Sequence, residues 1–302
     1  FIGVEVAENL KEAGLDVTII EAGEHIMPNI DKDMSHGLHG HVRTHGVKLA
    51  TSKLASEITK DGVVLADGGF VPAEMVILSI GVKPATAFLA GSGIQLGKRG
   101  EIIVDDYLHT NVDGIWAVGD AIAVKHFVSG EQTIIPLASP ANKQARIVAD
   151  NIKGRKVKYN GTQGTSIAKV FDMTVASTGL TEKDCIRLGI DYHKSFSATN
   201  SHAGYYPGPT MMTVKLLYTK GEGKVLGGQI VGYKGVDKRI DVLAVAIRAG
   251  MTVFDLHQLE LAYAPPFSSA KDPINMAGYV GENVVLGESK VATFEEVVAM
   301  GD

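Results

Sequence analysis

The chain has 302 residues, 45% of them hydrophobic, with a net charge of −5 and one cysteine. This length favours two or three domains, and the composition is typical of soluble α/β proteins and excludes a disordered tail. The sequence has no basic run for nucleic acid, no stretch of roughly 20 apolar residues for a membrane and no cysteine pair, which together predict a cytoplasmic protein.

The opening segment predicts a helix followed by a strand. Apolar residues recur at helical spacing as far as Gly14, the expected stop, and the run 17–20 predicts a strand ending at Glu21. Gly3 and Glu5 form the back half of a dinucleotide fingerprint, whose earlier glycines are expected upstream of this chain. An acid at this strand end binds both ribose hydroxyls and repels a 2′-phosphate, so Glu21 favours NADH over NADPH. The alternative is a surface glutamate after an ordinary helix.

The next residues continue a nucleotide-binding pattern. A helix is expected over 33–45, a hairpin turn at 66–69 and a buried parallel strand at 75–80, which is broken by the segment 81–84. We therefore expect an NAD-binding domain over residues 1–84 that lacks its first strand.

Four histidines crowd the helix predicted over 33–45. Only the pairs 36/39 and 41/45 share a helix face, and no nearby cysteine or fixed acid completes a zinc set. We therefore expect a solvated helix face and no metal site. The four residues are His36, His39, His41 and His45.

A second segment begins after residue 84. Its apolar run 114–118 predicts a strand that stops at Gly119 and Asp120, and a helix is expected over 139–152. Glycine allows a tight turn there, and the aspartate places a carboxylate at the carboxyl end of the sheet, where ligands of open α/β sheets bind. The alternative is a strand turn with a solvated aspartate.

The remainder of the chain, from residue 154, has an α+β pattern. A helix over 237–249 is expected to close at Gly250. The expected strands cover 166–170, 212–217 and 225–231.

The run from Thr110 to Asp120 resembles the second flavin motif of the pyridine nucleotide-disulfide oxidoreductases. The resemblance implies that Asp120, preceded by Gly119, binds the ribityl chain of FAD, and that Gly81 begins the crossover out of the NAD domain. It also implies a segment beside the flavin ring, formed by Pro136, Leu137 and Ala138.

The same resemblance implies the fold and the cofactors. It points to an α/β flavoprotein with two dinucleotide-binding (Rossmann-like) domains and a C-terminal α+β dimerisation domain. In this chain, residues 85–153 would be the second segment of the FAD-binding domain and residues 154–302 the dimerisation domain. The cofactors implied are FAD and NADH, with NADPH as an alternative to NADH.

Two C-terminal segments, 202–208 and 261–273, resemble the coenzyme A disulfide reductase and NADH-dependent persulfide reductase branch. That resemblance implies that Tyr205 and Tyr263 serve the substrate site, with Tyr206 as the alternative to Tyr205. A phenol is a hydrogen-bond donor at neutral pH and can orient a departing thiolate. The competing interpretation is that both tyrosines are packing residues.

The implied function is reduction of coenzyme A disulfide, persulfide or related small disulfides through a redox cysteine upstream of this chain. Cys185 is expected to be structural, although its predicted helix start, capped by Thr181, could lower a thiol pKa. The alternatives are an NADH oxidase or peroxidase of the same architecture, a flavin-bearing binding protein without turnover, and an inactive dimerising fragment.

The resemblance also implies a two-fold homodimer. We expect the loop 263–266 and an apolar helix face at the interface. In the family pattern the loop crosses to the other subunit, so each pocket would combine Tyr205 of one chain with Tyr263 of its partner. The apolar face consists of Ile240, Leu243, Ala244 and Ile247.

Overall fold

The computed structural model describes residues 1–301, apart from the side chains of residues 294 and 295, and has mixed α/β structure. The chain forms two compact units, Phe1–Ser79 with Ile167–Asp302, and Ile80–Ser166. The breaks follow residues 79 and 166, whereas the expected domain limits are residues 84 and 153. Assignment of residues 1–84 and 154–302 to separate domains stays a prediction, since both parts contribute to one compact unit here.

The second unit, Ile80–Ser166, is built around one helix and short strands. Its core contains Leu108, Ile122 and Val124, against which Ile147 and Val148 of the helix pack. The helix predicted over 139–152 is confirmed. The elements are η1 (Ala87–Leu89), β6 (Ile102–Ile103), η2 (Gly119–Ala121), β7 (Ile122–Lys125), β8 (Gln132–Thr133) and α3 (Ala138–Ile152).

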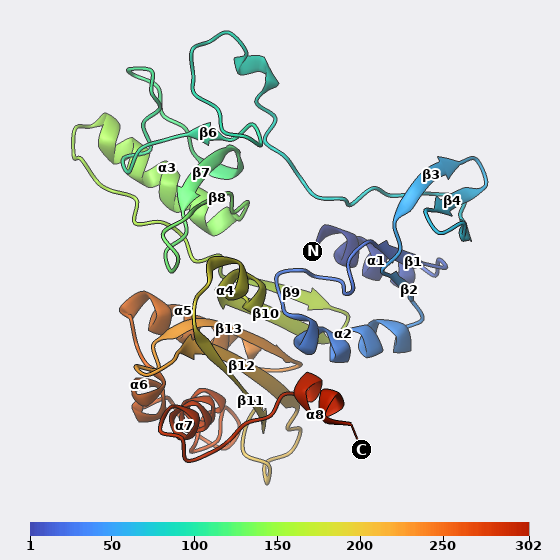
Figure 1. Cartoon of the computed structure of the whole chain (residues 1–302), viewed down its shortest axis with the longest axis vertical. Helices are drawn as coiled ribbons and strands as arrows, with labels where there is room; N and C mark the ends of the chain where they lie inside the picture. The colour runs from blue at the N-terminus through green and yellow to red at the C-terminus, as the bar shows by residue number, and fades with distance from the viewer. Residues whose placement is uncertain (302) are drawn as a thin grey trace. The chain divides into compact units, whose positions relative to one another are not determined.

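The N-terminal part of the first unit follows the predicted order of helix and strand (Figure 1). Strands β1 and β2 pair in parallel, and the turn at 66–69 joins the antiparallel strands β4 and β5, which confirms the predicted hairpin. The elements are α1 (Ile2–Glu12), β1 (Thr18–Glu21), α2 (Lys32–Thr44), β2 (Lys48–Thr51), β3 (Ala55–Thr59), β4 (Gly62–Leu65) and β5 (Phe70–Pro72).

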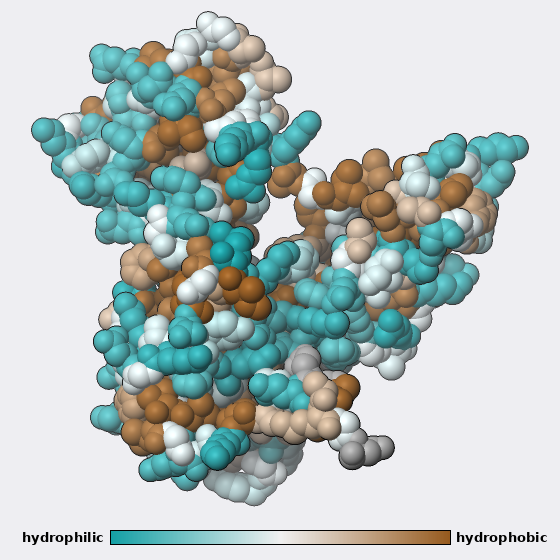
Figure 2. Space-filling model, viewed as in Figure 1, coloured by the Kyte–Doolittle hydropathy of each residue, from teal (hydrophilic) through white to brown (hydrophobic). Residues whose placement is uncertain are grey.

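Two strand predictions are wrong. Residues 75–80 form no strand, and their side chains are not buried, since Leu78 and Ile80 are 66% and 89% exposed. Hydrophobic surface is visible on several parts of the chain (Figure 2). In the run 114–118 only Trp116 makes a bridge, to His109. A buried strand needs hydrogen-bonded neighbours, and no strand among the described residues pairs with either run.

The C-terminal part of the first unit is a five-stranded sheet in the order β11-β12-β13-β10-β9. The pairs β11–β12, β12–β13 and β10–β13 are antiparallel. The predicted strands and the predicted helix that ends at Gly250 are confirmed. The elements are β9 (Ser166–Val170), β10 (Met173–Gly179), α4 (Glu182–Leu188), β11 (Tyr192–Asn200), β12 (Met211–Thr219), β13 (Val225–Gly232), α5 (Val236–Ala249), α6 (Val253–Gln258), α7 (Pro273–Val285) and α8 (Phe294–Met300).

The apolar face of α5 packs against its own sheet. Ile240, Leu243 and Ile247 are all buried, and the helix contacts β10 and β13. The expectation that this face forms the dimer interface is therefore wrong, because these side chains already fill the core of one chain.

No helix among the described residues combines the length and the apolar character needed to span a bilayer.

The N-terminal part and the sheet share one hydrophobic core. Val4 of α1 and Leu38 and Val42 of α2 belong to the same buried cluster as Val170 of β9 and Val175 of β10. Burial of this apolar area favours association of the two parts, but it does not fix their register, since the hydrophobic effect is not directional.

A buried ion cluster supplies that direction. Lys215 of β12 has no solvent exposure, and its Nζ lies 2.8 Å from Asp31 Oδ2 and 2.7 Å from Asp33 Oδ2, at the start of α2. It also pairs with Glu182, the first residue of α4, whose Oε1 lies 3.0 Å from Lys194 Nζ. Three carboxylates thus surround one buried cation, and they join α2 and α4 to the sheet.

We predict that Lys215→Met lowers the free energy of unfolding by about 3 to 5 kcal/mol, because it leaves buried carboxylates without their central cation. Urea denaturation measures this value. Lys220→Met is the matched control, since Lys220 makes an exposed ion pair with Asp191 and should contribute less than about 1 kcal/mol. Equal losses in the two variants would contradict a structural role for the cluster.

The cluster also predicts how stability depends on pH. Burial raises the pKa of Glu182, but hydrogen bonding and charge from Lys215 outweigh it and lower that pKa from 4.5 to about 2. This stabilisation is therefore complete above pH 4.5 and is lost as the pH falls toward 2. Burial raises the pKa of Asp33, so the contribution of Asp33 to stability changes with pH in the opposite sense to that of Glu182. Glu182→Gln should flatten the acid slope of stability, and an unchanged slope would count against the assignment.

Candidate functional site

The candidate nucleotide residues lie at one end of the parallel pair β1–β2. Gly3 is in the first turn of α1, where a Cβ atom would come within 3.1 Å of Ser79 Cβ, so glycine allows the helix to lie close to that segment. Glu21 ends β1, and its half-buried carboxylate accepts a hydrogen bond of 2.7 Å from the Gly23 N–H. Glu5 is exposed in the first turn of α1. A fixed acid at a strand end fits the diol of an adenosine ribose.

The candidate flavin residues of the second unit gather at the start of α3. Gly119 adopts a φ of 82°, and its N–H donates to Gln144 Oε1 of α3 at 2.7 Å. A Cβ atom on Gly119 would lie 3.9 Å from Ala141 Cβ, in the first turn of that helix. Asp120 follows with an exposed carboxylate that can accept a ribityl hydroxyl.

The segment predicted to pass beside the flavin leads into the same helix end. Leu137 is the N-cap of α3, Ala138 is its first residue, and the exposed Pro136 precedes them. These residues and Gly119 are thus brought together by α3, which fits one ligand site. Gly81 lies in an irregular exposed segment with a φ of 98°.

The two candidate catalytic tyrosines meet. The Tyr205 hydroxyl, in the loop between β11 and β12, lies 2.7 Å from the Tyr263 hydroxyl, in the loop between α6 and α7. Both side chains are exposed, at 76% and 47%. The hydrogen bond to Tyr205 raises the pKa of Tyr263, and either hydroxyl can be the donor within the pair. The hydroxyl that accepts this bond keeps its own proton for a ligand. Tyr206 instead packs edge-on against His202.

One buried arginine holds both tyrosine loops. Arg239 of α5 donates to the Ser201 carbonyl oxygen at 2.9 Å, to Ser268 Oγ at 3.0 Å and to Asp272 Oδ2 at 2.9 Å. The Ala203 N–H also donates to the Ser268 carbonyl oxygen at 3.0 Å, which ties one loop to the other. The phenols are therefore exposed, but their backbones are anchored.

Asp272 completes this anchor and also caps α7. Burial raises its pKa, but hydrogen bonds from the Ile274 N–H, from Ser268 and from Arg239 outweigh burial and lower it. The carboxylate is thus charged opposite Arg239 at neutral pH. The sequence pattern did not identify Arg239 or Asp272, because their roles depend on contacts between distant segments.

The tyrosine pair corrects one expectation. Tyr205 and Tyr263 of the same chain are hydrogen-bonded. The prediction of a pocket that takes one tyrosine from each subunit is therefore wrong. Any site that uses this pair receives both phenols from one protomer.

Cys185 is buried within α4, and Thr181 caps that helix as predicted. Burial raises the pKa of its thiol to about 12, and the nearby carboxylates of Asp184, Asp31 and Glu182 add to the shift. The prediction that the helix start could lower the pKa of the Cys185 thiol is therefore wrong. A thiol with these properties is a packing group and not a nucleophile.

The histidine helix also differs from its prediction. His39 and His41 are buried rather than solvated, and the His39 ring accepts the Ile26 N–H at 3.2 Å. His41 and His45, the pair expected to share a face, both approach Asp172 of the β9–β10 turn. This acid could not be found from sequence spacing, since it lies far along the chain.

Sequence comparisons match most of the chain. The profile of the pyridine nucleotide-disulphide oxidoreductase family matches residues 1–145, and the profile of its dimerisation domain matches residues 165–273. The coenzyme A disulfide reductase of Staphylococcus haemolyticus is 32% identical over 280 residues, which are 92% of this chain and 63% of that protein. The chain thus spans less than two thirds of this curated relative.

Two solved structures are similar to the chain. The reduced CoADR-RHD protein of Bacillus anthracis superposes with a TM-score of 0.96 and 46% identity, over 99% of this chain and 55% of that one. The NAD-dependent persulfide reductase of A. fulgidus gives a TM-score of 0.94 and 38% identity, over 97% of this chain and 55% of that one.

We predict that Cys185 resists alkylation by iodoacetamide at pH 8 in the folded chain. With a thiol pKa of about 12, only about one molecule in ten thousand carries a thiolate at that pH, and burial excludes the reagent. Mass spectrometry should show no adduct on the folded chain and one adduct after unfolding in guanidinium, which is the control. Labelling at equal rates in both states would refute this prediction.

Proposed function

Because the chain belongs to the pyridine nucleotide-disulphide oxidoreductase family, we propose that the whole protein is an FAD-dependent NAD(P)H oxidoreductase. Its proposed substrates are coenzyme A disulfide, a persulfide or a related small disulfide. The observation that carries this substrate class is the hydroxyl pair of Tyr205 and Tyr263, 2.7 Å apart on two anchored loops. The names of the relatives support the same class.

The residues of this chain have separate proposed roles in holding the cofactors. Glu21 binds the adenosine ribose of the nicotinamide nucleotide and favours NADH over NADPH, since its carboxylate repels a 2′-phosphate. Asp120 accepts a ribityl hydroxyl of FAD, and Gly119 with Pro136, Leu137 and Ala138 shapes the adjacent surface. When bound, the two cofactors supply the electron and hydride chemistry.

The tyrosine pair acts on the leaving sulfur. When a thiolate attacks a disulfide, the second sulfur leaves as a thiolate that needs a hydrogen-bond donor. The pair supplies that donor, because the hydroxyl that accepts within the pair keeps its own proton free. A free phenol has a pKa of about 10, above the thiol value of about 8.5. A phenol of the pair therefore stabilises the thiolate by donating a hydrogen bond to it.

The attacking thiol must come from outside these 302 residues. Cys185 is the only cysteine of the chain, and its burial and raised pKa make it unreactive. We propose a redox cysteine elsewhere in the whole protein. We also propose a homodimer, which the matched dimerisation domain supports, with an interface other than the buried face of α5.

The activity is tested with the purified whole protein and NADH. We expect NADH oxidation to depend on added coenzyme A disulfide or persulfide, and NADH to be used in preference to NADPH. Oxygen consumption without disulfide is the control, because an NADH oxidase of the same architecture would show it. Rapid oxygen-dependent turnover, unaffected by disulfide, would reject the proposed substrate class.

A mixing experiment tests the tyrosine pair. In the whole protein, Tyr205→Phe and Tyr263→Phe should each lower turnover with disulfide about five- to tenfold, the effect of losing one hydrogen bond. Because both phenols serve the same site from one chain, the 1:1 mixture of the two variants should stay at the mean of its parents. Tyr206→Phe is the matched control and should remain near wild type. Recovery in the mixture, with subunit exchange confirmed by mass spectrometry, would mean that the pair is divided between subunits.

A further inference from the structure

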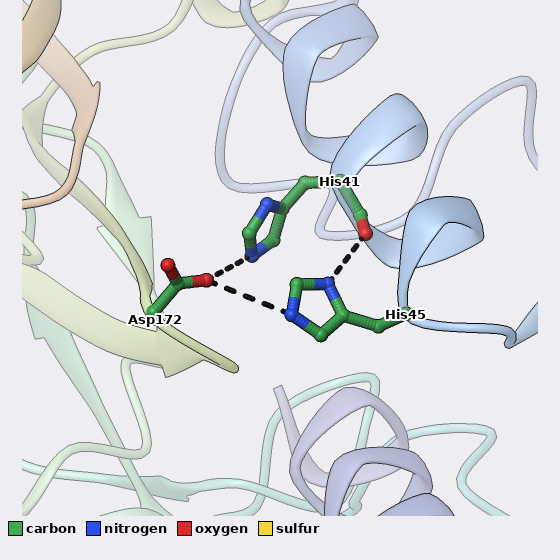
Figure 3. A group of neighbouring side chains, drawn as sticks. All are labelled: His41, His45 and Asp172. Carbon is green, nitrogen blue, oxygen red and sulfur yellow. Dashed lines mark hydrogen bonds and ion pairs between the residues drawn. The ribbon is translucent and has the colours of Figure 1, made fainter.

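Three metal-ligating side chains meet at a place that the proposed redox function does not use. His41 lies in the last turn of α2, His45 is the C-cap residue of that helix, and Asp172 lies in the turn between β9 and β10 (Figure 3). Asp172 Oδ1 is 3.0 Å from His41 Nε2 and 3.7 Å from His45 Nε2. One nitrogen from each ring therefore points at the same carboxylate oxygen.

The second nitrogen of each ring faces Asp172. His45 Nδ1 lies 2.9 Å from the carbonyl oxygen of His41 and donates to it, so that Nε2 is the nitrogen turned toward Asp172. His41 hydrogen-bonds the backbone of Val170. Its Nε2 is buried, and the polar atom that it faces is Asp172 Oδ1 at 3.0 Å.

The acid is presented by a rigid turn. Phe171 precedes Asp172 and has a φ of 55°, a left-handed conformation that is uncommon for a bulky residue. Its N–H donates to Glu8 Oε2 at 2.7 Å, and Glu8 also pairs with Lys169. The His45 ring stacks on the Phe171 ring with centroids 4.2 Å apart. These contacts fix the turn against α1 and α2.

We propose that His41, His45 and Asp172 form a binding site for one zinc-type divalent cation. Zinc bonds of about 2.0 to 2.2 Å in tetrahedral geometry separate neighbouring ligand atoms by about 3.3 to 3.5 Å. The two measured separations, 3.0 and 3.7 Å, bracket that value. Two imidazoles and one carboxylate are a ligand set that zinc uses, and small side-chain rotations place all three atoms around one ion.

The surroundings agree with this assignment. An open hollow borders the site, and its lining includes two lysines as well as acids: Lys11, Glu12, His45, Lys169, Phe171 and Asp172. A bound ion would link α2 to the β9–β10 turn.

Isothermal titration of the metal-free whole protein with zinc chloride tests the site. We expect binding of one equivalent and a rise in melting temperature on adding zinc. His45→Asn and Asp172→Asn should each lower the affinity at least tenfold and abolish the rise. These side chains are partly or fully exposed, and the melting temperature without metal shows whether each variant is folded. His36→Asn is the matched control, because His36 is an exposed histidine of the same helix.

A second readout identifies the ligands. Cobalt bound in place of zinc should give the visible absorption of a four-coordinate site in the wild type and in His36→Asn, and lose it in Asp172→Asn. Absence of stoichiometric binding by the wild type would overturn the proposal. Binding that is unchanged by both His45→Asn and Asp172→Asn would also overturn it, since the ion would then lie elsewhere.

Discussion

A lysine side chain without solvent exposure must be neutralised inside the protein, and Lys215 obtains its counter-charges from helices α2 and α4. The shared hydrophobic core brings the N-terminal part and the sheet together, while the ion cluster fixes which residues face one another. Asp31 shows this coupling, since it also accepts the Glu182 N–H at 3.0 Å and the Gln229 amide at 2.6 Å. The position of α2, and therefore of its histidines, depends on this cluster.

Arg239 plays the corresponding part for the tyrosine loops. A guanidinium offers five donors in a fixed plane, so one side chain can hold Ser201, Ser268 and Asp272 together. The exposed phenols of Tyr205 and Tyr263 can then meet without being buried. The surface formed by the two phenols is thus accessible, and its geometry is set by polar groups beneath it.

The sequence predicted the elements whose side-chain pattern and hydrogen-bonding neighbours both lie within the chain. The strand at 225–231 and the helix ending at Gly250 are of this kind. The runs 75–80 and 114–118 have a strand pattern but no ladder partner among the described residues. Tyr205 and Tyr263 were found by resemblance to a family. Asp172 could not be found, because only the folded chain brings it to α2.

Glu8 makes contacts that connect the beginning of the chain to its C-terminal half. Its carboxylate accepts the Phe171 N–H and pairs with Lys169, more than 160 residues later in the sequence. During synthesis, residues 1–79 leave the ribosome before their partners exist, and the unit 80–166 must be translated in between. At roughly 5 to 20 residues per second, that delay is on the order of ten seconds. Throughout this interval the apolar sides of α1 and α2 lack the packing surface that β9 and β10 later supply.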